Sequence, residues 1–202
     1  MHATRTRRTL IAAFAMALIV VACSGGDAKP LQSDSAGSCP TSQPAVAAAG
    51  TTRDVTMVTS KGTIVLRLSA DLSPIAVGNF LALVDCGYYN GVIFHRVVPG
   101  FVIQGGDPEG TGMGGPGYSI KDEPVIGSYR RGTLAMARTA APDSQGSQFF
   151  IVLDDAAAVP LESVRTYAIL GEVVSGLDAV DAIAAVARDG NDRPIDPVTI
   201  VS

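Results

Sequence analysis

Short apolar runs separated by glycine, proline and polar turns recur along the chain from residue 54 onward. Residues 54–60 and 63–68 flank Lys61-Gly62, and the second run alternates apolar and polar side chains, which predicts a β-hairpin. Further strands are expected at later apolar runs, residues 133–137, 148–152, 167–174 and 197–201. Many short strands and 22 glycines favour a mainly β domain, either a sandwich or a barrel.

Two stretches carry the apolar spacing of an amphipathic helix. The first begins at Ser73-Pro74, an N-cap residue followed by a proline at the first helical position, and ends before Gly87. The second covers residues 177–186, where Leu177, Val180 and Ile183 share one face. Helices are therefore a minor part of the expected fold.

The most informative stretch is residues 94–107, FHRVVPGFVIQGGD. Its apolar residues form two short strand segments on either side of the turn signal Pro99-Gly100. Side chains alternate faces along a strand, so Arg96, Val98 and Gln104 are expected to point the same way. A second stretch, residues 146–151, adds Gln148 and two phenylalanines. Together the two stretches offer a cation, amides and an apolar surface, without an evident nucleophile–base pair.

Three ordered motifs, FHRVVPGFVIQGGD, GTLAMAR at 132–138 and GSQFFI at 146–151, resemble the cyclophilin family of peptidyl-prolyl cis-trans isomerases. The resemblance runs from Arg53 to the C-terminus. It implies a closed eight-stranded antiparallel β-barrel capped by two α-helices. It also implies an enzyme that rotates Xaa-Pro peptide bonds without a cofactor or a metal ion, and proline-containing polypeptides as its partners.

The resemblance assigns catalytic roles to Arg96, Gln104 and Phe101. It places the substrate against Val102, Ala137, Arg138, Gln148, Phe150, Leu161 and Tyr167. Phe101, Val102, Phe150 and Leu161 would line a proline pocket, whereas Phe149, which alternates with Phe150, is expected in the core. The chain departs from the family where Arg138 replaces a common asparagine and Tyr167 a frequent histidine. It also lacks tryptophan, so sensitivity to inhibitors of the cyclosporin type is in doubt.

The chemistry of isomerisation explains why an arginine is wanted. Amide resonance gives the peptide bond a rotational barrier of about 18–20 kcal/mol. In the twisted transition state the nitrogen lone pair is localised and accepts a hydrogen bond. A guanidinium held near that nitrogen, here Arg96, stabilises the twisted state more than either planar state.

The N-terminus carries export signals. Residues 1–22 combine Arg5, Arg7 and Arg8 with an apolar run too short to span a bilayer, as in a secretory signal peptide. The run ends in Val-Val-Ala-Cys, which resembles a lipobox, so we expect lipidation of Cys23 and an extracytoplasmic, membrane-anchored protein. Residues 23–52 have the composition of a flexible linker, and residues 53–202 form the isomerase domain.

With the Cys23 thiol carrying the lipid, two cysteines remain that could have free thiols, Cys39 in the expected linker and Cys86 in the domain. Outside the cytoplasm two thiols can pair, but the sequence gives no distance between them, so both the free and the paired forms stay open. Cleavage of the signal moves the net charge from −4 to −7. An acidic chain of this kind disfavours nucleic acid as a partner, and we expect a monomer.

Other signals are weaker. The sequence GTGMGG at 110–115 satisfies a dinucleotide fingerprint, but Pro116-Gly117 follows where a helix should begin, so a glycine-rich loop is favoured. Asp122-Glu123 is interpreted as a solvated turn. His95 is too isolated for a metal site, and Ser147 lacks the glycine context of a hydrolase nucleophile. Two functions fit the remaining chemistry, namely an isomerase of exported proteins and a chaperone module that holds proline segments with little turnover.

Overall fold

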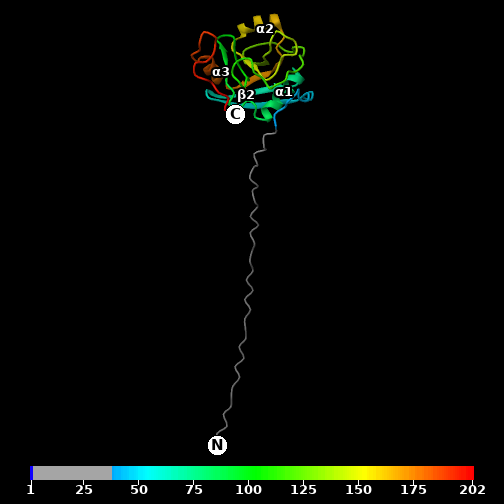
Figure 1. The fold of residues 1–202 in the computed structure, drawn as a ribbon, viewed down its shortest axis with the longest axis vertical. Helices are drawn as coiled ribbons and strands as arrows, with labels where there is room; N and C mark the ends of the chain where they lie inside the picture. Colours follow the sequence, from blue (N-terminus) through cyan, green and yellow to red (C-terminus); the bar gives the residue numbers. More distant parts are fainter. Residues whose placement is uncertain (2–37) are drawn as a thin grey trace. The chain divides into compact units, whose positions relative to one another are not determined.

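The computed structural model describes residue 1 and residues 38–202. Its strands are β1 (Thr52–Thr59), β2 (Gly62–Ser69), β3 (Arg96–Val98), β4 (Val102–Gly105), β5 (Thr133–Met136), β6 (Phe149–Val152) and β7 (Ile169–Ser175). Its helices are α1 (Pro74–Asp85), the 3₁₀ turn η1 (Asp155–Ala157), α2 (Ala158–Val164) and α3 (Leu177–Ala184) (Figure 1).

The strands form one antiparallel sheet in the order β1-β2-β7-β5-β6-β4-β3. The mainly β prediction is confirmed, but the described residues contain seven sheet strands where eight were expected, and α2 is an additional helix. The expected last strand at 197–201 forms isolated bridges instead. Its backbone bonds to Val58 and Ser60 on one side and to Gly91, Val92 and Phe94 on the other. The sheet itself does not close, so a closed barrel stays a prediction.

The two faces of the sheet carry different clusters. Val97, Ile103, Ile151 and Leu134 align across β3, β4, β6 and β5 and are fully buried in the main core. Helices α1 and α3 both contact β2 on this inner side. The opposite face carries a second apolar cluster that includes Val102, Phe150, Val152 and Leu161. Figure 1 shows α2, which supplies Leu161, at the far side of the domain from β2.

The predicted local signals hold with one difference. Thr59 pairs with Gly62 at the hairpin turn, and Gly87 adopts the left-handed conformation that follows a helix C-cap. Ser73 precedes α1, but its hydroxyl donates to the Leu72 carbonyl and does not cap the helix. The carboxylate of Glu123 accepts hydrogen bonds from Ile75 N and Ala76 N at 2.7 and 2.8 Å, which satisfies two orphan donors of the first turn.

Residues 38–51, here called the N-terminal arm, contact the domain although their composition is that of a linker. Cys39 forms a disulfide with Cys86 at the C-terminus of α1, which decides the pairing that the sequence left open. Ala47 N donates to Pro74 O at 3.0 Å. A side chain at Gly78 would lie 2.4 Å from Ala45 O, so glycine in α1 lets the arm approach closely.

The expected signal peptide, the lipidation site Cys23 and linker residues 23–37 lie outside the described residues. Within residues 38–202, no helix combines the length and hydropathy needed to cross a bilayer.

Candidate active site

Four side chains form a row across the outer face of the sheet. Arg96 on β3 lies opposite Gln104 on β4, Gln104 lies opposite Phe150 on β6, and Phe150 lies opposite Ala135 on β5. Directly opposed residues of an antiparallel sheet project from the same face. The strand register therefore brings Arg96 and Gln104 together beside Phe150, as the alternation along residues 94–107 predicts for Arg96 and Gln104.

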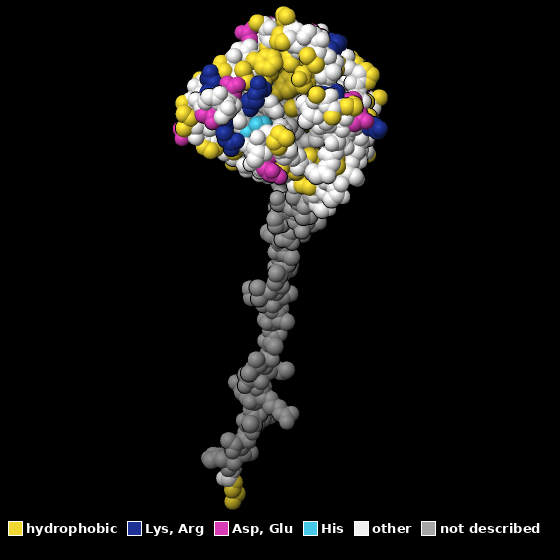
Figure 2. Space-filling model, turned by 45° about the horizontal axis from the view of Figure 1, so that its top comes forward, with side chains coloured by type: hydrophobic (Ala, Val, Ile, Leu, Met, Phe, Trp, Pro, Cys, Tyr) yellow, Lys and Arg dark blue, Asp and Glu magenta, His cyan; other side chains and the backbone are white. Residues whose placement is uncertain are grey.

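A cavity of about 200 Å³ opens over this row. It is lined by Arg96, Phe101, Val102, Gln104, Ala137, Arg138, Phe150, Leu161 and Tyr167. These are nine of the ten residues assigned to catalysis or substrate binding. The cavity accepts one small ring more readily than a drug-sized ligand, because ligand pockets usually measure about 300–1,000 Å³. Figure 2 shows hydrophobic side chains gathered on one face of the domain, with basic side chains at their edge.

The apolar side of the cavity rests on rigid contacts. Phe150 and Tyr167 pack edge to face, with ring centroids 5.3 Å apart. The Tyr129 hydroxyl donates to Tyr167 O at 2.7 Å and accepts from Tyr167 N at 3.2 Å, so it fixes the backbone that carries Tyr167. Burial raises the pKa of Tyr129 to about 12. Its phenol therefore stays protonated and remains a donor throughout the neutral range.

A chain of amide hydrogen bonds positions the polar side of the cavity. Arg96 Nη1 donates to Gln104 Oε1 at 3.4 Å, and Gln104 Nε2 donates to Gln148 Oε1 at 3.0 Å. Gln148 Nε2 in turn donates to the carbonyls of Gly112 and Gly114 at 3.0 and 2.9 Å. Gln148, the tenth predicted residue, thus orients Gln104 from outside the cavity. Among residues 38–202, the other N–H groups of Arg96 have no hydrogen-bond partner.

The glycine-rich loop at 110–117 is organised around Asp107. The buried Asp107 carboxylate accepts hydrogen bonds from Glu109 N, Gly112 N, Gly114 N and the Thr111 hydroxyl. Burial alone would raise its pKa, but the backbone donors of Glu109, Gly114 and Gly112 outweigh burial and hold the pKa of Asp107 below its usual value. A Cβ at Gly114 would lie 2.1 Å from Asp107 Oδ1, so only glycine fits there. Asp107 thereby fixes the carbonyls that orient Gln148.

A larger pocket of about 400 Å³ adjoins the first. Gln104, Ala137 and Arg138 line both pockets and form the wall between them. The rest of the larger pocket is lined by residues 112–119 and by Thr139, Ser144, Gly146, Ser147 and Gln148. At the wall between the pockets the β pairing continues past the end of β5, because Ala137 N donates to Gln148 O at 2.9 Å.

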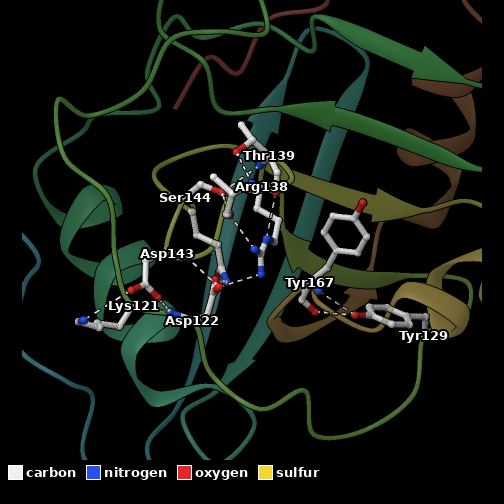
Figure 3. Close-up of polar contacts among 10 residues, drawn as sticks. Lys121, Asp122, Tyr129, Arg138, Thr139, Asp143, Ser144 and Tyr167 are labelled. Carbon is white, nitrogen blue, oxygen red and sulfur yellow. Dashed lines mark hydrogen bonds and ion pairs between the residues drawn. The ribbon is translucent and has the colours of Figure 1, made fainter.

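Arg138 is held as part of this wall (Figure 3). Its Nη1 donates to Asp122 Oδ2 at 2.8 Å, its Nη2 to Ala141 O at 2.7 Å and its Nε to Thr139 O at 3.1 Å. The Arg138 side chain is 10% exposed and that of Asp122 is 26% exposed. The interpretation of Asp122-Glu123 as a solvated turn is therefore wrong, because Asp122 holds Arg138 and Glu123 caps α1.

Comparison with known proteins settles the family. Residues 54–202 match the family described as cyclophilin type peptidyl-prolyl cis-trans isomerase/CLD. The chain belongs to this cyclophilin family. Peptidyl-prolyl cis-trans isomerase A of Mycobacterium tuberculosis is 40% identical over 170 residues, which cover 75% of this chain and 91% of the relative. Peptidyl-prolyl cis-trans isomerase ppi1 of Schizosaccharomyces pombe is 44% identical over 154 residues, covering 73% and 96%.

Solved structures agree with this assignment. A cyclophilin type isomerase of Cryptosporidium parvum is 35% identical with a TM-score of 0.68, covering 74% of this chain and 94% of that chain. A second structure of that protein, determined in the presence of the dipeptide Ala-Pro, is 36% identical with a TM-score of 0.67, covering 73% and 95%. The chain is accordingly a peptidyl-prolyl cis-trans isomerase of the cyclophilin type.

Two residues with catalytic potential in other enzymes are structural in this cyclophilin. His95 is buried beside the glycine-rich loop, and burial lowers its pKa. Its ring nitrogens have no hydrogen-bond partner in the part of the chain that the structure describes. Ser147 is fully buried, and its hydroxyl donates to Gly106 O at 2.6 Å. In residues 38–202, no three His, Cys, Asp or Glu side chains converge as metal ligands would.

Asp107, Asp122 and α2 are the parts of this cyclophilin site that sequence reasoning missed. Asp107 closes the FHRVVPGFVIQGGD motif and precedes a run of glycines, so its role as a loop acceptor had a local signal. Asp122 had none, because its partners Arg138 and Asp143 lie 16 and 21 residues away. The polar and alanine-rich residues before Leu161 obscured α2, which depends on packing against the sheet.

Proposed function

We propose that this cyclophilin isomerises Xaa-Pro bonds of exported polypeptides, with Arg96 as the group that stabilises the twisted amide. The observation that carries the proposal is the row of Arg96, Gln104 and Phe150 along the rim and floor of one ring-sized cavity. The Cryptosporidium parvum relative studied in the presence of Ala-Pro supports a proline-containing substrate for this chain.

The geometry supports a division of labour. The proline ring enters the cavity against Phe101, Phe150 and Leu161, where it loses contact with water and cannot turn. The acyl side of the bond then rotates past Gln104 and Arg96. Gln104 Nε2 uses one of its two hydrogens for Gln148, so the other remains to hold the substrate carbonyl.

The chemical step requires no covalent intermediate. As the bond twists, the proline nitrogen becomes pyramidal and its lone pair becomes a hydrogen-bond acceptor. An N–H of Arg96 donates to it, and this bond exists only in the twisted state, so it lowers the barrier without tightening ground-state binding. Because the guanidinium is a cation, its N–H groups are strong donors to the localised lone pair.

An exchange assay on an Xaa-Pro peptide tests the role of Arg96. We expect Arg96→Ala to lower kcat/KM about 100-fold, or about 2.7 kcal/mol, and to change peptide affinity much less. Arg67→Ala is the matched control, because it removes an exposed arginine whose partner Asp54 lies on the hairpin away from the cavity. Equal losses of turnover and affinity would instead favour a chaperone that holds proline segments with little turnover.

We further propose that the enzyme works at an extracytoplasmic membrane surface, where a lipid on Cys23 anchors it as a monomer. We also propose that its sheet closes into a barrel. The lipobox-like Val-Val-Ala-Cys supports the anchor. The C-terminal residues that bond to both Val58 and Val92 support closure. Metabolic labelling with a radioactive fatty acid should mark the wild-type protein and not Cys23→Ser, and label on both would refute the assignment of the lipid to Cys23.

A further inference from the structure

Asp122 lies outside both pockets, yet its carboxylate holds Arg138, which lines both of them, and the residues on either side of Ser144, which lines the larger one. It accepts hydrogen bonds from Arg138 Nη1 at 2.8 Å, from Asp143 N at 2.9 Å and from Gln145 Nε2 at 3.0 Å. Arg138 belongs to the wall shared by the two pockets, whereas Asp143 and Gln145 line neither pocket and flank Ser144, which lines the larger one. One carboxylate therefore sets the positions of a wall and of the adjacent loop.

The contact between Asp122 and Asp143 is reciprocal. Asp122 N donates to Asp143 Oδ1 at 2.8 Å, while Asp143 N donates back to Asp122 Oδ2 (Figure 3). Asp143 has φ of 52°, a left-handed conformation that is uncommon for residues other than glycine. The paired hydrogen bonds hold the loop in this conformation. Without them, we expect the loop to relax toward other backbone angles.

The segment that carries Asp122 is itself anchored on both sides. Lys121 N donates to Gln43 Oε1 of the N-terminal arm at 2.9 Å. Glu123 is bound to the first turn of α1. The arm is joined to α1 through Cys39 and Cys86. Asp122 is consequently presented from a fixed base, which a residue that positions others requires.

We propose that Asp122 is a positioning residue that sets substrate selectivity, by holding Arg138 and the 139–145 loop in the shape that receives a side chain flanking the proline. With the ring in the 200 Å³ cavity, a neighbouring residue of the peptide reaches the 400 Å³ pocket across the Ala137–Arg138 wall. Three N–H groups of Arg138 are bonded to the protein, so Arg138 shapes the pocket and its charge is neutralised by Asp122. This inference rests on the proposed isomerase function.

The test measures kcat/KM for a series of Xaa-Pro peptides that differ only in the residues flanking the proline. The protein is the chain from residue 23 onward, carrying Cys23→Ser so that it is not lipidated. We expect Asp122→Asn to compress the spread of kcat/KM across the series about tenfold, because large flanking side chains lose their fitted pocket whereas alanine loses little. Asp54→Asn, which weakens the exposed Arg67 ion pair, is the matched control and should leave the spread unchanged.

Asp143→Gly provides a second route if Asp122→Asn fails to fold. Glycine accepts a φ of 52° without strain, so this variant removes the carboxylate that accepts from Asp122 N, together with its exposed ion pair with Lys121. It should compress the spread in the same direction as Asp122→Asn. The inference would be overturned if either variant left the spread of kcat/KM unchanged, or if it changed kcat/KM by the same factor for every peptide.

The proposed function has its own readout in the same experiment. Turnover of the reference Ala-Pro peptide by the parent protein tests the isomerase assignment. If the parent failed that test, NMR titration with the same peptide series would still measure binding selectivity. Loss of binding selectivity in Asp122→Asn would then support the role of Asp122, and unchanged selectivity would refute it.

Discussion

Reduction of the Cys39–Cys86 disulfide should destabilise the domain, and the structure bounds the size of the effect. The bond links residues 47 apart, and the loop-closure model assigns such a cross-link about 4 kcal/mol through the restricted unfolded chain. Once the disulfide is reduced, the native state can gain freedom by releasing the arm. Release lowers the free energy of the reduced native state, so about 4 kcal/mol is an upper value and we expect about 2–4 kcal/mol.

Urea unfolding with and without a thiol reductant measures the difference. The chain with Cys23→Ser is used so that only Cys39 and Cys86 respond. Hydrogen exchange at Ala47 N, which donates to Pro74 O, reports whether the arm leaves before the domain unfolds. A change in unfolding free energy below about 1 kcal/mol would refute the loop-closure reasoning. Two free thiols by mass spectrometry of the unreduced protein would refute the disulfide itself.

Three further predictions concern residues around the cavity. Gln148→Leu should lower kcat about tenfold in the exchange assay, because Gln104 loses the partner that orients it, while the urea midpoint changes little. The pKa of Asp107 is lower in the folded protein than in the unfolded chain, so its ionised carboxylate stabilises the fold above about pH 4, and this stabilisation is lost as the pH falls through the folded pKa. Asp107→Asn should therefore reduce the drop in the urea midpoint between pH 7 and pH 3. Tyr129→Phe should cost about 1–2 kcal/mol in urea unfolding and raise KM, because it removes the bonds to the Tyr167 backbone.

Local patterns predicted the parts of the site that depend on alternation along a strand. Arg96 and Gln104 lie on one face and Phe149 on the other because the register of β3, β4 and β6 follows the apolar pattern. The lining of the cavity by Leu161 and Tyr167 came only from family resemblance. No local rule connects these residues to Phe150, since α2 and the strand after it are placed by tertiary packing.

The sequence was least informative about residues whose partners are distant. The composition of residues 38–51 is that of a linker, yet this segment binds the domain. Its contacts are Gln43 with Lys121, Ala47 with Pro74 and Cys39 with Cys86. A segment with few large apolar side chains gains order from backbone and disulfide bonds that composition does not encode. Asp122 was mistaken for part of a solvated turn for a similar reason, because its partners Arg138 and Asp143 are distant in the sequence.

Arg96 and Arg138 both line the 200 Å³ cavity but differ in how tightly the protein holds them. Arg138 makes three short hydrogen bonds, so its guanidinium cannot turn toward a substrate without breaking an ion pair that is 10% and 26% exposed. Arg96 has one long hydrogen bond, at 3.4 Å, to Gln104. Arg138 uses three of its five N–H groups for bonds to the protein, whereas Arg96 uses one, so Arg96 has more N–H groups available to an amide nitrogen that becomes pyramidal. The long contact with Gln104 therefore suits the role proposed for Arg96, which is to form a stronger hydrogen bond only in the twisted state.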